Sequence, residues 1–411
     1  MTQKQKNYFI FFVGLTSTFP IRVLGLLYPV EIIALLSFPF ISKNGLWSNQ
    51  RMKKVIGMAV LWFVGALIAD FYNKTAFVDC LKGWFTILFF VSLIPFVYWA
   101  LADNPKRWLW YVAGTGISSV LSFYLVKAND MNEMAFEVWQ VYAWGGLCKT
   151  IAAVLYYKGK HKFAFLVYMF WAVYTLFNGS RNTFLCISMA VIILYYIDGL
   201  KVSNMGDKVF VFQKKLIPMF FILICGALVV DKVYENMASQ GVLGERAYEK
   251  YWQQKMASGS ILQSGRSTTF MGLELALRNP LIGYGSFARD KNNSFRYEYA
   301  STHNMDIAID DKEDSLLPTH SHIVGFWVYH GILGGLFWIY IIWLMFKVLK
   351  TGAFFSEPKM IGLFMVSFVS ILWDIVFSPL GQRAPIVFFI VYLVVTESYY
   401  LKGRYLQRLS H

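Results

Sequence analysis

Long apolar runs separated by short polar connections dominate the chain. A helix needs about 20 apolar residues to cross a bilayer, so this spacing predicts twelve membrane-spanning helices. They are expected near residues 8–20, 24–42, 55–72, 83–101, 108–126, 139–156, 163–178, 184–199, 216–231, 322–346, 360–377 and 386–401. The first two are the least distinct, because Pro20 and Arg22 interrupt a nearly continuous run. The pattern predicts an all-α integral membrane protein with a single transmembrane domain, residues 1–411.

Composition supports this prediction. Of the 411 residues, 57% are hydrophobic and 15% are charged, whereas a soluble domain carries roughly 25% charged residues. Aromatic residues reach 18%, which suits a protein anchored at two membrane interfaces. The first apolar segment has no small-residue cleavage site, and another segment follows at once, so we expect no cleavable signal peptide.

The net charge of +14 could indicate nucleic acid or anionic lipid, and the distribution of the charge decides for the membrane. Seven clusters of Lys and Arg occur on alternate connections and at both termini, while the short connections between them hold only a few basic residues. Basic residues concentrate on the cytoplasmic side of membrane proteins. Both termini are therefore expected in the cytoplasm, with no role in binding nucleic acid.

Residues 232–321 form the one long connection, which this alternation places outside. Tyr248, Tyr251 and Trp252 share one helical face, which predicts a helix lying on the membrane interface. A second helix is expected over Ser267–Arg278, ending at Asn279-Pro280, with a turn at the glycines that follow. A loop of this length on a compact protein is more often functional than idle.

Two arginines on the outer side are candidate anion ligands. Arg181 stands in Gly-Ser-Arg-Asn between two spans, and Arg266 stands at the expected start of a helix. Arginine is the preferred planar partner of phosphate, and helix amides would assist it. Each arginine has an ordinary alternative, since Arg181 could simply extend toward the headgroups and Arg266 could be a solvated surface residue.

The histidines His320 and His322 stand at the entrance of the span near 322–346. Two histidines at this spacing point to different sides of a helix, so we expect no metal site. A single imidazole at the membrane surface suits general-base catalysis, although a polar interface histidine is the simpler reading. The acidic run 310–314 is expected to be a solvated loop rather than a metal site. Two guanidinium groups and an imidazole together favour transfer from a pyrophosphate leaving group to an alcohol.

Three motifs resemble the O-antigen ligase and polymerase superfamily of bacterial envelopes. They are Ser180-Arg181 before an apolar span, Gly265-Arg266 leading to Asn279-Pro280-Leu281-Ile282-Gly283-Tyr284-Gly285, and a histidine eleven residues before Gly331-Ile332-Leu333-Gly334. The order of the motifs, their spacing across residues 178–335 and the long outside loop strengthen the resemblance. The first 170 residues resemble the family only in being hydrophobic.

The resemblance implies a GT-C-type membrane glycosyltransferase of the bacterial inner membrane. Its active site would face the periplasm, and its donor would be a glycan linked to undecaprenyl pyrophosphate, with no cofactor and no metal. By position, Arg181 and Arg266 would bind the pyrophosphate and His320 would be the catalytic histidine, although many members have Asn where Ser321 stands. Possible accessory residues are Arg278, His303, His322, Asp311 and Asp314.

The acceptor stays open at this point. The residues that make up the motifs favour a polymerase that joins lipid-linked repeat units. The alternative is a ligase that transfers the glycan to lipid A–core. A non-enzyme, a transporter of lipid-linked glycan, would show the same spans. Such a transporter should carry intramembrane charges, for which Glu31, Lys149 and Asp374 are the candidates, although buried pairs or helix ends would explain them equally.

Overall fold

The apolar runs fold into helices. The computed structural model describes residues 1–22, 26–41, 45–127, 133–178, 180–200, 209–215, 218, 229, 232–258, 267–303 and 315–409. Its first helices are α1 (Gln3–Thr16), α2 (Pro29–Ile41), α3 (Gln50–Tyr72), α4 (Phe77–Leu101), α5 (Arg107–Ser122), α6 (Glu133–Tyr157), α7 (His161–Phe177) and α8 (Arg181–Asp198). Then follow α10 (Glu245–Ser258), α12 (Ser267–Arg278), α13 (Ser294–His303), α14 (His322–Thr351), α15 (Ile361–Phe377) and α16 (Arg383–Leu409). The predicted all-α class is confirmed.

Within the described residues, six helices are long and apolar enough to cross a membrane. They cover Gln50–Tyr72, Phe77–Leu101, Arg181–Asp198, His322–Thr351, Pro358–Phe377 and Arg383–Gly403. Two shorter apolar helices cover Pro29–Pro39 and His161–Phe177. The chain is thus a multi-pass membrane protein by its helices. The expected total of twelve spans stays a prediction, since the span near 216–231 lies almost entirely outside the described residues.

The first two expected spans differ most from the structure. Strands β1 (Ile21–Arg22) and β2 (Leu26–Leu27) pair antiparallel between α1 and α2, so the run does not continue as helix. The flanking helices have only 14 and 13 residues. At 1.5 Å per residue each covers about 20 Å, which is less than the roughly 30 Å of a hydrocarbon core.

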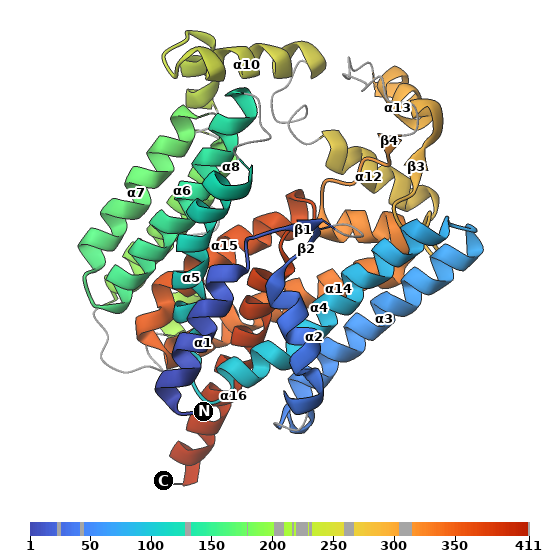
Figure 1. Ribbon diagram of the computed structural model, residues 1–411. Coiled ribbons are helices and arrows are strands. Elements are labelled where there is room, and N and C mark those ends of the chain that lie inside the picture. The colour runs from blue at the N-terminus through green and yellow to red at the C-terminus, as the bar shows by residue number, and fades with distance from the viewer. Residues whose placement is uncertain are drawn as a thin grey trace.

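The two ends of the bundle carry different parts of the chain (Figure 1). Both termini lie at one end, and α10, α12 and α13 lie at the other. The predicted helix over Ser267–Arg278 is confirmed. The helix predicted around Tyr248, Tyr251 and Trp252 is α10, and its position on the membrane interface stays a prediction. The elements of residues 232–321 therefore gather opposite the termini, as expected for a single long connection on one side.

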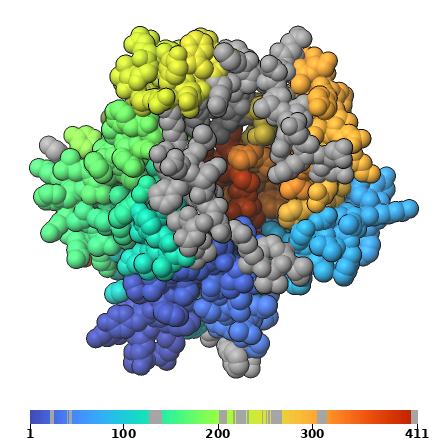
Figure 2. Space-filling view, turned by 45° about the horizontal axis from the view of Figure 1, so that its top comes forward, coloured from blue at the N-terminus to red at the C-terminus, as the bar shows by residue number. Residues whose placement is uncertain are grey.

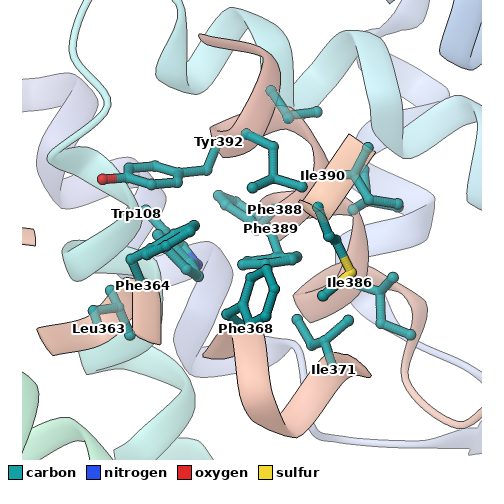
Figure 3. Packing of buried hydrophobic residues seen from close by; sticks show 14 of the residues in the cluster. Trp108, Leu363, Phe364, Phe368, Ile371, Ile386, Phe388, Phe389, Ile390 and Tyr392 are labelled. Carbon is teal, nitrogen blue, oxygen red and sulfur yellow. The ribbon is translucent and has the colours of Figure 1, made fainter. Parts of the chain in front are cut away.

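Aromatic and aliphatic side chains of α5, α15 and α16 form the centre of the core (Figure 3). Trp108 packs against Tyr392 with ring centroids 4.6 Å apart, and Phe364 stacks on Phe389 at 6.0 Å. The α16 span has the largest buried share among the six candidate spans. Helices α15 and α16 therefore supply a rigid centre, and the short connection between them lies against it.

Helix α14 is broken near its first third. His330 and Gly331 leave helical geometry, and Gly331 has φ +66°, a conformation that costs a residue with a Cβ atom. The segment after α12 satisfies the freed carbonyls, because Tyr284 N donates to Val328 O at 2.8 Å and Gly285 N donates to Tyr329 O at 2.9 Å. The Asn-Pro-Leu-Ile-Gly-Tyr-Gly motif thus serves as the partner of this break.

Candidate functional site

Two cavities lie on either side of the connection between α15 and α16. One, here called the polar cavity, has a volume of about 550 Å³, and the other, the apolar cavity, has about 580 Å³. Ser378, Gln382 and Pro385 line the polar cavity. Pro379, Leu380, Gly381 and Arg383 line the apolar cavity. Residues 378–385 are therefore a partition whose two faces belong to different cavities.

The bundle is hollowed on the face that carries α10, α12 and α13. Figure 2 shows a depression there, with atoms coloured as the C-terminal part of the chain at its floor. The lining of both cavities includes the ends of helices at this face, such as Thr183 of α8 and Gly325 of α14. Both volumes fall within the roughly 300–1,000 Å³ of ordinary ligand sites.

The polar cavity lies among α5, α6, α7, α8 and α15 and contains two opposite charges. Lys149 of α6 and Asp374 of α15 both line it, and Ser378 Oγ donates to Asp374 Oδ1 at 2.9 Å. Trp171 and Trp373 contribute aromatic faces. Ionisable residues inside membrane helices are costly and usually mark a functional path or site.

The apolar cavity is walled by Phe85, Phe89 and Phe326 and carries two cations, Lys82 and Arg383. Phe85 is 38% exposed and Leu26, also in the wall, is 54% exposed. Phe85 lies on α4, one of the candidate membrane spans, where an exposed apolar side chain can contact lipid. The apolar wall suits a lipid chain, and each of the two cations is paired with a carboxylate, Lys82 with Asp79 and Arg383 with Glu31.

Arg383 is held by Glu31 in a buried, two-pronged ion pair. Arg383 Nε donates to Glu31 Oε1 at 2.6 Å, and Nη2 donates to Oε2 at 2.8 Å. Nη2 also donates to Leu26 O at 2.8 Å. Glu31 is fully buried, so the pair fixes the start of α16 against α2. The three candidate intramembrane charges thus fall into two groups, because Glu31 is part of a buried ion pair whereas Lys149 and Asp374 line one cavity.

A network of buried polar side chains borders the apolar cavity at the break in α14. Asp70 at the end of α3 accepts hydrogen bonds from Ser286 N at 2.6 Å, Ser286 Oγ at 2.9 Å and Trp84 Nε1 at 2.8 Å. Ser286 Oγ also lies 3.1 Å from His330 Nε2. Trp62 Nε1 donates to His330 Nδ1 at 2.9 Å. The network joins α3, α4, α14 and the segment after α12.

The donors and acceptors of this network determine which atom carries each hydrogen. Nδ1 of His330 accepts from Trp62, so a neutral ring carries its hydrogen on Nε2 and donates it to Ser286 Oγ. The Ser286 hydroxyl in turn donates to Asp70. His330 therefore cannot accept the Ser286 proton in this arrangement. The trio resembles a hydrolase triad only in its residue types, and its geometry supports the α14 break.

His320, the predicted base, lies at the rim of the apolar cavity. Its neighbours Thr319 and Ser321 line that cavity, and its side chain is exposed. Thr269 Oγ1 of α12 donates to His320 O at 3.0 Å, and Ser321 Oγ caps α14 by accepting from Val324 N at 3.2 Å. Both contacts hold the backbone on either side of the imidazole.

Arg181, the first predicted phosphate ligand, begins α8 at the rim of the polar cavity. Ser180, Asn182 and Thr183 line that cavity, and the Arg181 guanidinium lies 4.9 Å from the centre of the Tyr234 ring. Arg266, Asp311 and Asp314 lie outside the described residues. The predicted approach of Arg181 to Arg266 therefore stays a prediction.

The accessory candidates have structural contacts. Arg278 donates to Glu298 at 3.0 and 2.9 Å and to Glu274 at 2.7 Å, which ties α12 to α13. The hydrogen bond from Arg278 keeps the pKa of Glu298 below its ordinary value. His303 is exposed and stacks on Tyr299 with ring centroids 4.1 Å apart. Neither Arg278 nor His303 lines either cavity.

His322, the remaining accessory candidate within the described residues, is buried. It is 2% exposed and packs against Trp338 with ring centroids 4.7 Å apart. Removing a buried ring leaves a cavity, which usually destabilises a protein by a few kcal/mol. A loss of function at His322 would therefore not by itself indicate catalysis.

Sequence reasoning missed Asp70, Ser286 and His330. The available signal was the presence of a carboxylate and an imidazole within apolar runs, which is costly unless they are paired. Ser286 follows the glycine-rich motif directly and carries no signal of its own. Their partners come from four separated segments, so the pairing could not be inferred from spacing.

Comparison with protein-family models and with curated proteins finds no match to this chain.

Proposed function

We propose that this protein is a glycosyltransferase of the bacterial inner membrane, acting on its periplasmic face. It moves a glycan from undecaprenyl pyrophosphate to a sugar hydroxyl, and it is a polymerase of O-antigen or another surface polysaccharide. The fold is then of the GT-C type with twelve spans, and residues 232–321 form its periplasmic loop. Its partners are the lipid-linked glycan, the acceptor glycan and the membrane lipids.

The observation that carries this proposal is the partition between the two cavities. The neighbours of Arg181 line one cavity and the neighbours of His320 line the other, and residues 378–385 separate them. Transfer between two large substrates needs a site for each substrate, with the two sites close together. Two cavities that share one wall supply two such sites, and the linings of both include helix ends at the hollowed face of the bundle (Figure 2).

In the proposed reaction the acceptor hydroxyl oxygen attacks carbon 1 of the donor sugar. The bond from carbon 1 to the pyrophosphate oxygen breaks, and undecaprenyl pyrophosphate leaves with the electron pair. His320 accepts the hydroxyl proton, a contribution of typically 10²–10⁴-fold. Arg181 and Arg266 bind the phosphates and stabilise the charge that develops on them. A single displacement of this kind inverts the anomeric centre, and guanidinium groups take the place of a metal ion.

The apolar cavity supports a lipid-linked substrate. Its phenylalanine wall includes Phe85 of a candidate membrane span, and the guanidinium of Arg383 lies at its edge. Nη1 of Arg383 makes no hydrogen bond to any described residue, so it can donate to an anionic group. In a polymerase both substrates carry the same lipid, and two cavities suit two lipid-linked molecules. The alternative, a ligase, has lipid A–core as its acceptor.

The test is transfer by the purified protein in lipid nanodiscs, given a native lipid-linked repeat unit. We expect the His320→Ala variant to lose chain growth. The His303→Ala variant should retain it, because His303 is exposed and lies outside both cavities. Both variants should be equally abundant and equally heat-stable. Near wild-type transfer by His320→Ala would show that the base is elsewhere. Adding lipid A–core as an acceptor distinguishes a ligase from a polymerase. Exhaustive chelation tests the expected independence of the reaction from metal ions.

A transporter of lipid-linked glycan is the second candidate. The specific observation in its favour is that Lys149 and Asp374 line one intramembrane cavity. Glu31 no longer supports it, since Arg383 holds that carboxylate. Proteoliposomes that move a labelled lipid-linked glycan between leaflets, with no change in glycan length, would favour the transporter over the transferase.

A further inference from the structure

The polar cavity contains a pair of opposite charges that do not touch. Lys149 and Asp374 both line it, and the positive charge of Lys149 acts on the Asp374 carboxylate. Lys149 nevertheless makes no ion pair with Asp374 or with another carboxylate of the described residues. Opposite charges in a low-dielectric interior attract strongly. Two such charges remain apart stably when polar groups of a bound molecule lie between them.

The chemistry of the gap restricts what can fill it. An ammonium group only donates hydrogen bonds and a carboxylate only accepts them. A hydroxyl group does both, so it can accept from Lys149 and donate to Asp374 at once. A phosphate or a carboxylate can accept from Lys149, but it has no hydrogen to offer Asp374. A ligand with neighbouring hydroxyl groups therefore fits the two charges better than an anion does.

The other residues that line the polar cavity also suit a ligand with hydroxyl groups. Within the described residues, the side chains of Ser367, Ser370 and Gln382 line the cavity and make no hydrogen bond of their own. Polar groups without partners are costly in the interior of an apolar bundle. The indole faces of Trp171 and Trp373 add flat apolar surfaces. Hydroxyl-binding groups beside flat aromatic rings suit a sugar, which has polar edges and apolar C–H faces.

We propose that the polar cavity binds a neutral sugar ring, with its neighbouring hydroxyls between Lys149 and Asp374 and one of its faces against an indole. This inference rests on the proposed transferase, for which it names the site of one substrate's sugar unit. Asn182 and Thr183, beside Arg181, line the same cavity. A sugar bound there lies next to the proposed pyrophosphate site.

The test is saturation-transfer NMR on the protein in phosphatidylcholine nanodiscs. The probes are methyl glycosides of glucose, galactose, mannose, rhamnose and the two common N-acetylhexosamines, with glycerol as a simple polyol. We expect at least one glycoside to bind. Lys149→Met and Asp374→Asn should each weaken its binding about tenfold or more, the loss of one hydrogen bond to a charged group. Lys158→Met, an exposed lysine between α6 and α7, should leave it unchanged.

Ser370→Leu provides a second test, because it adds volume to the cavity wall and removes no charge. It should also abolish binding, and the thermal midpoint of each variant shows whether the fold is kept. Unchanged sugar binding in folded Lys149→Met and Asp374→Asn would overturn the proposal. So would the absence of binding by every glycoside, or binding of glycerol as strong as that of the sugars, which would indicate a lipid headgroup.

The outcomes separate this inference from the proposed function. If the wild-type protein binds glycosides through Lys149 and Asp374 but transfers no glycan in nanodiscs, the sugar site stands and the transferase fails. If it transfers glycan while the variants bind glycosides as the wild type does, the transferase stands and the sugar site fails.

Discussion

Replacing Asp70 tests the buried network directly. Its carboxylate is 2% exposed and accepts three hydrogen bonds, two from Ser286 and one from Trp84. All three partners are donors. In Asp70→Asn one of the two oxygens becomes an NH₂ group, which donates and cannot accept. The variant keeps the shape of the side chain and changes only its hydrogen bonding.

The magnitude follows from counting the donors that lose their acceptor. In Asp70→Asn the amide oxygen can still accept from Ser286 N, and the Ser286 hydroxyl can turn to accept from the new NH₂ group. Trp84 Nε1 and the Ser286 hydroxyl have then both lost their acceptor, and each unsatisfied buried donor costs about 1–3 kcal/mol. In Asp70→Ala all three donors lose their acceptor, so the loss should exceed about 3 kcal/mol.

The assay is the thermal midpoint of the purified protein in one detergent, followed by size-exclusion chromatography after heating. The matched control is Asp79→Asn on α4, the same chemical change at a partly exposed ion pair with Lys82. Such a pair contributes about 0–1 kcal/mol. From the most to the least stable, the expected order of the variants is Asp79→Asn, Asp70→Asn and Asp70→Ala. An Asp70→Asn protein as stable as the control would refute the donor count.

Three further predictions concern other parts of the molecule. Gly331→Ala should reduce folded protein sharply, because an added Cβ would overlap Leu281 O at a φ of +66°, whereas Gly57→Ala, which meets nothing within 4 Å, should be neutral; the yield of monodisperse protein decides. Burial raises the pKa of Asp103, but hydrogen bonds from Arg107 and Lys6 outweigh it and hold the pKa well below its ordinary value. The resulting stability is present above about pH 4 and is lost as the pH falls through the folded-state pKa, so the thermal midpoint should fall below pH 4 more steeply for wild type than for Asp103→Asn. Single cysteines at the exposed positions 240 and 297 should react with an impermeant reagent from the periplasmic side; labelling only from the cytoplasm would contradict the topology.

The local features of the fold were predictable and the long-range ones were not. The end of the helix Ser267–Arg278 follows from Asn279-Pro280, because proline disfavours helix in the residue before it. The break at His330 and Gly331 could not be predicted, since the apolar pattern continues through it. A break inside a bundle is stable only when other groups satisfy the freed carbonyls, and here those groups come from Tyr284 and Gly285.

The candidate site shows the same division. The motifs around Arg181 and His320 were found from the sequence, and their neighbours line the two cavities. Residues 378–385, which separate the cavities, carry no motif. Their role depends on which face of a short connection meets which helices, and that is decided by packing among α5, α8, α14 and α15. Lys149 and Asp374 were noted singly, and only the fold brings them into one cavity.

The partition is fixed at both of its ends. Ser378 donates from N and from Oγ to Asp374 at 2.9 Å, and Arg383 is held by Glu31. Exposed connections commonly tolerate added or deleted residues. Ser378 and Gln382 line the polar cavity, and Pro379 to Gly381 between them line the apolar cavity. A residue inserted between the two anchors would therefore displace both sets of lining side chains. The length of this connection is therefore as restricted as the identity of its residues, and an insertion there would impair both cavities at once.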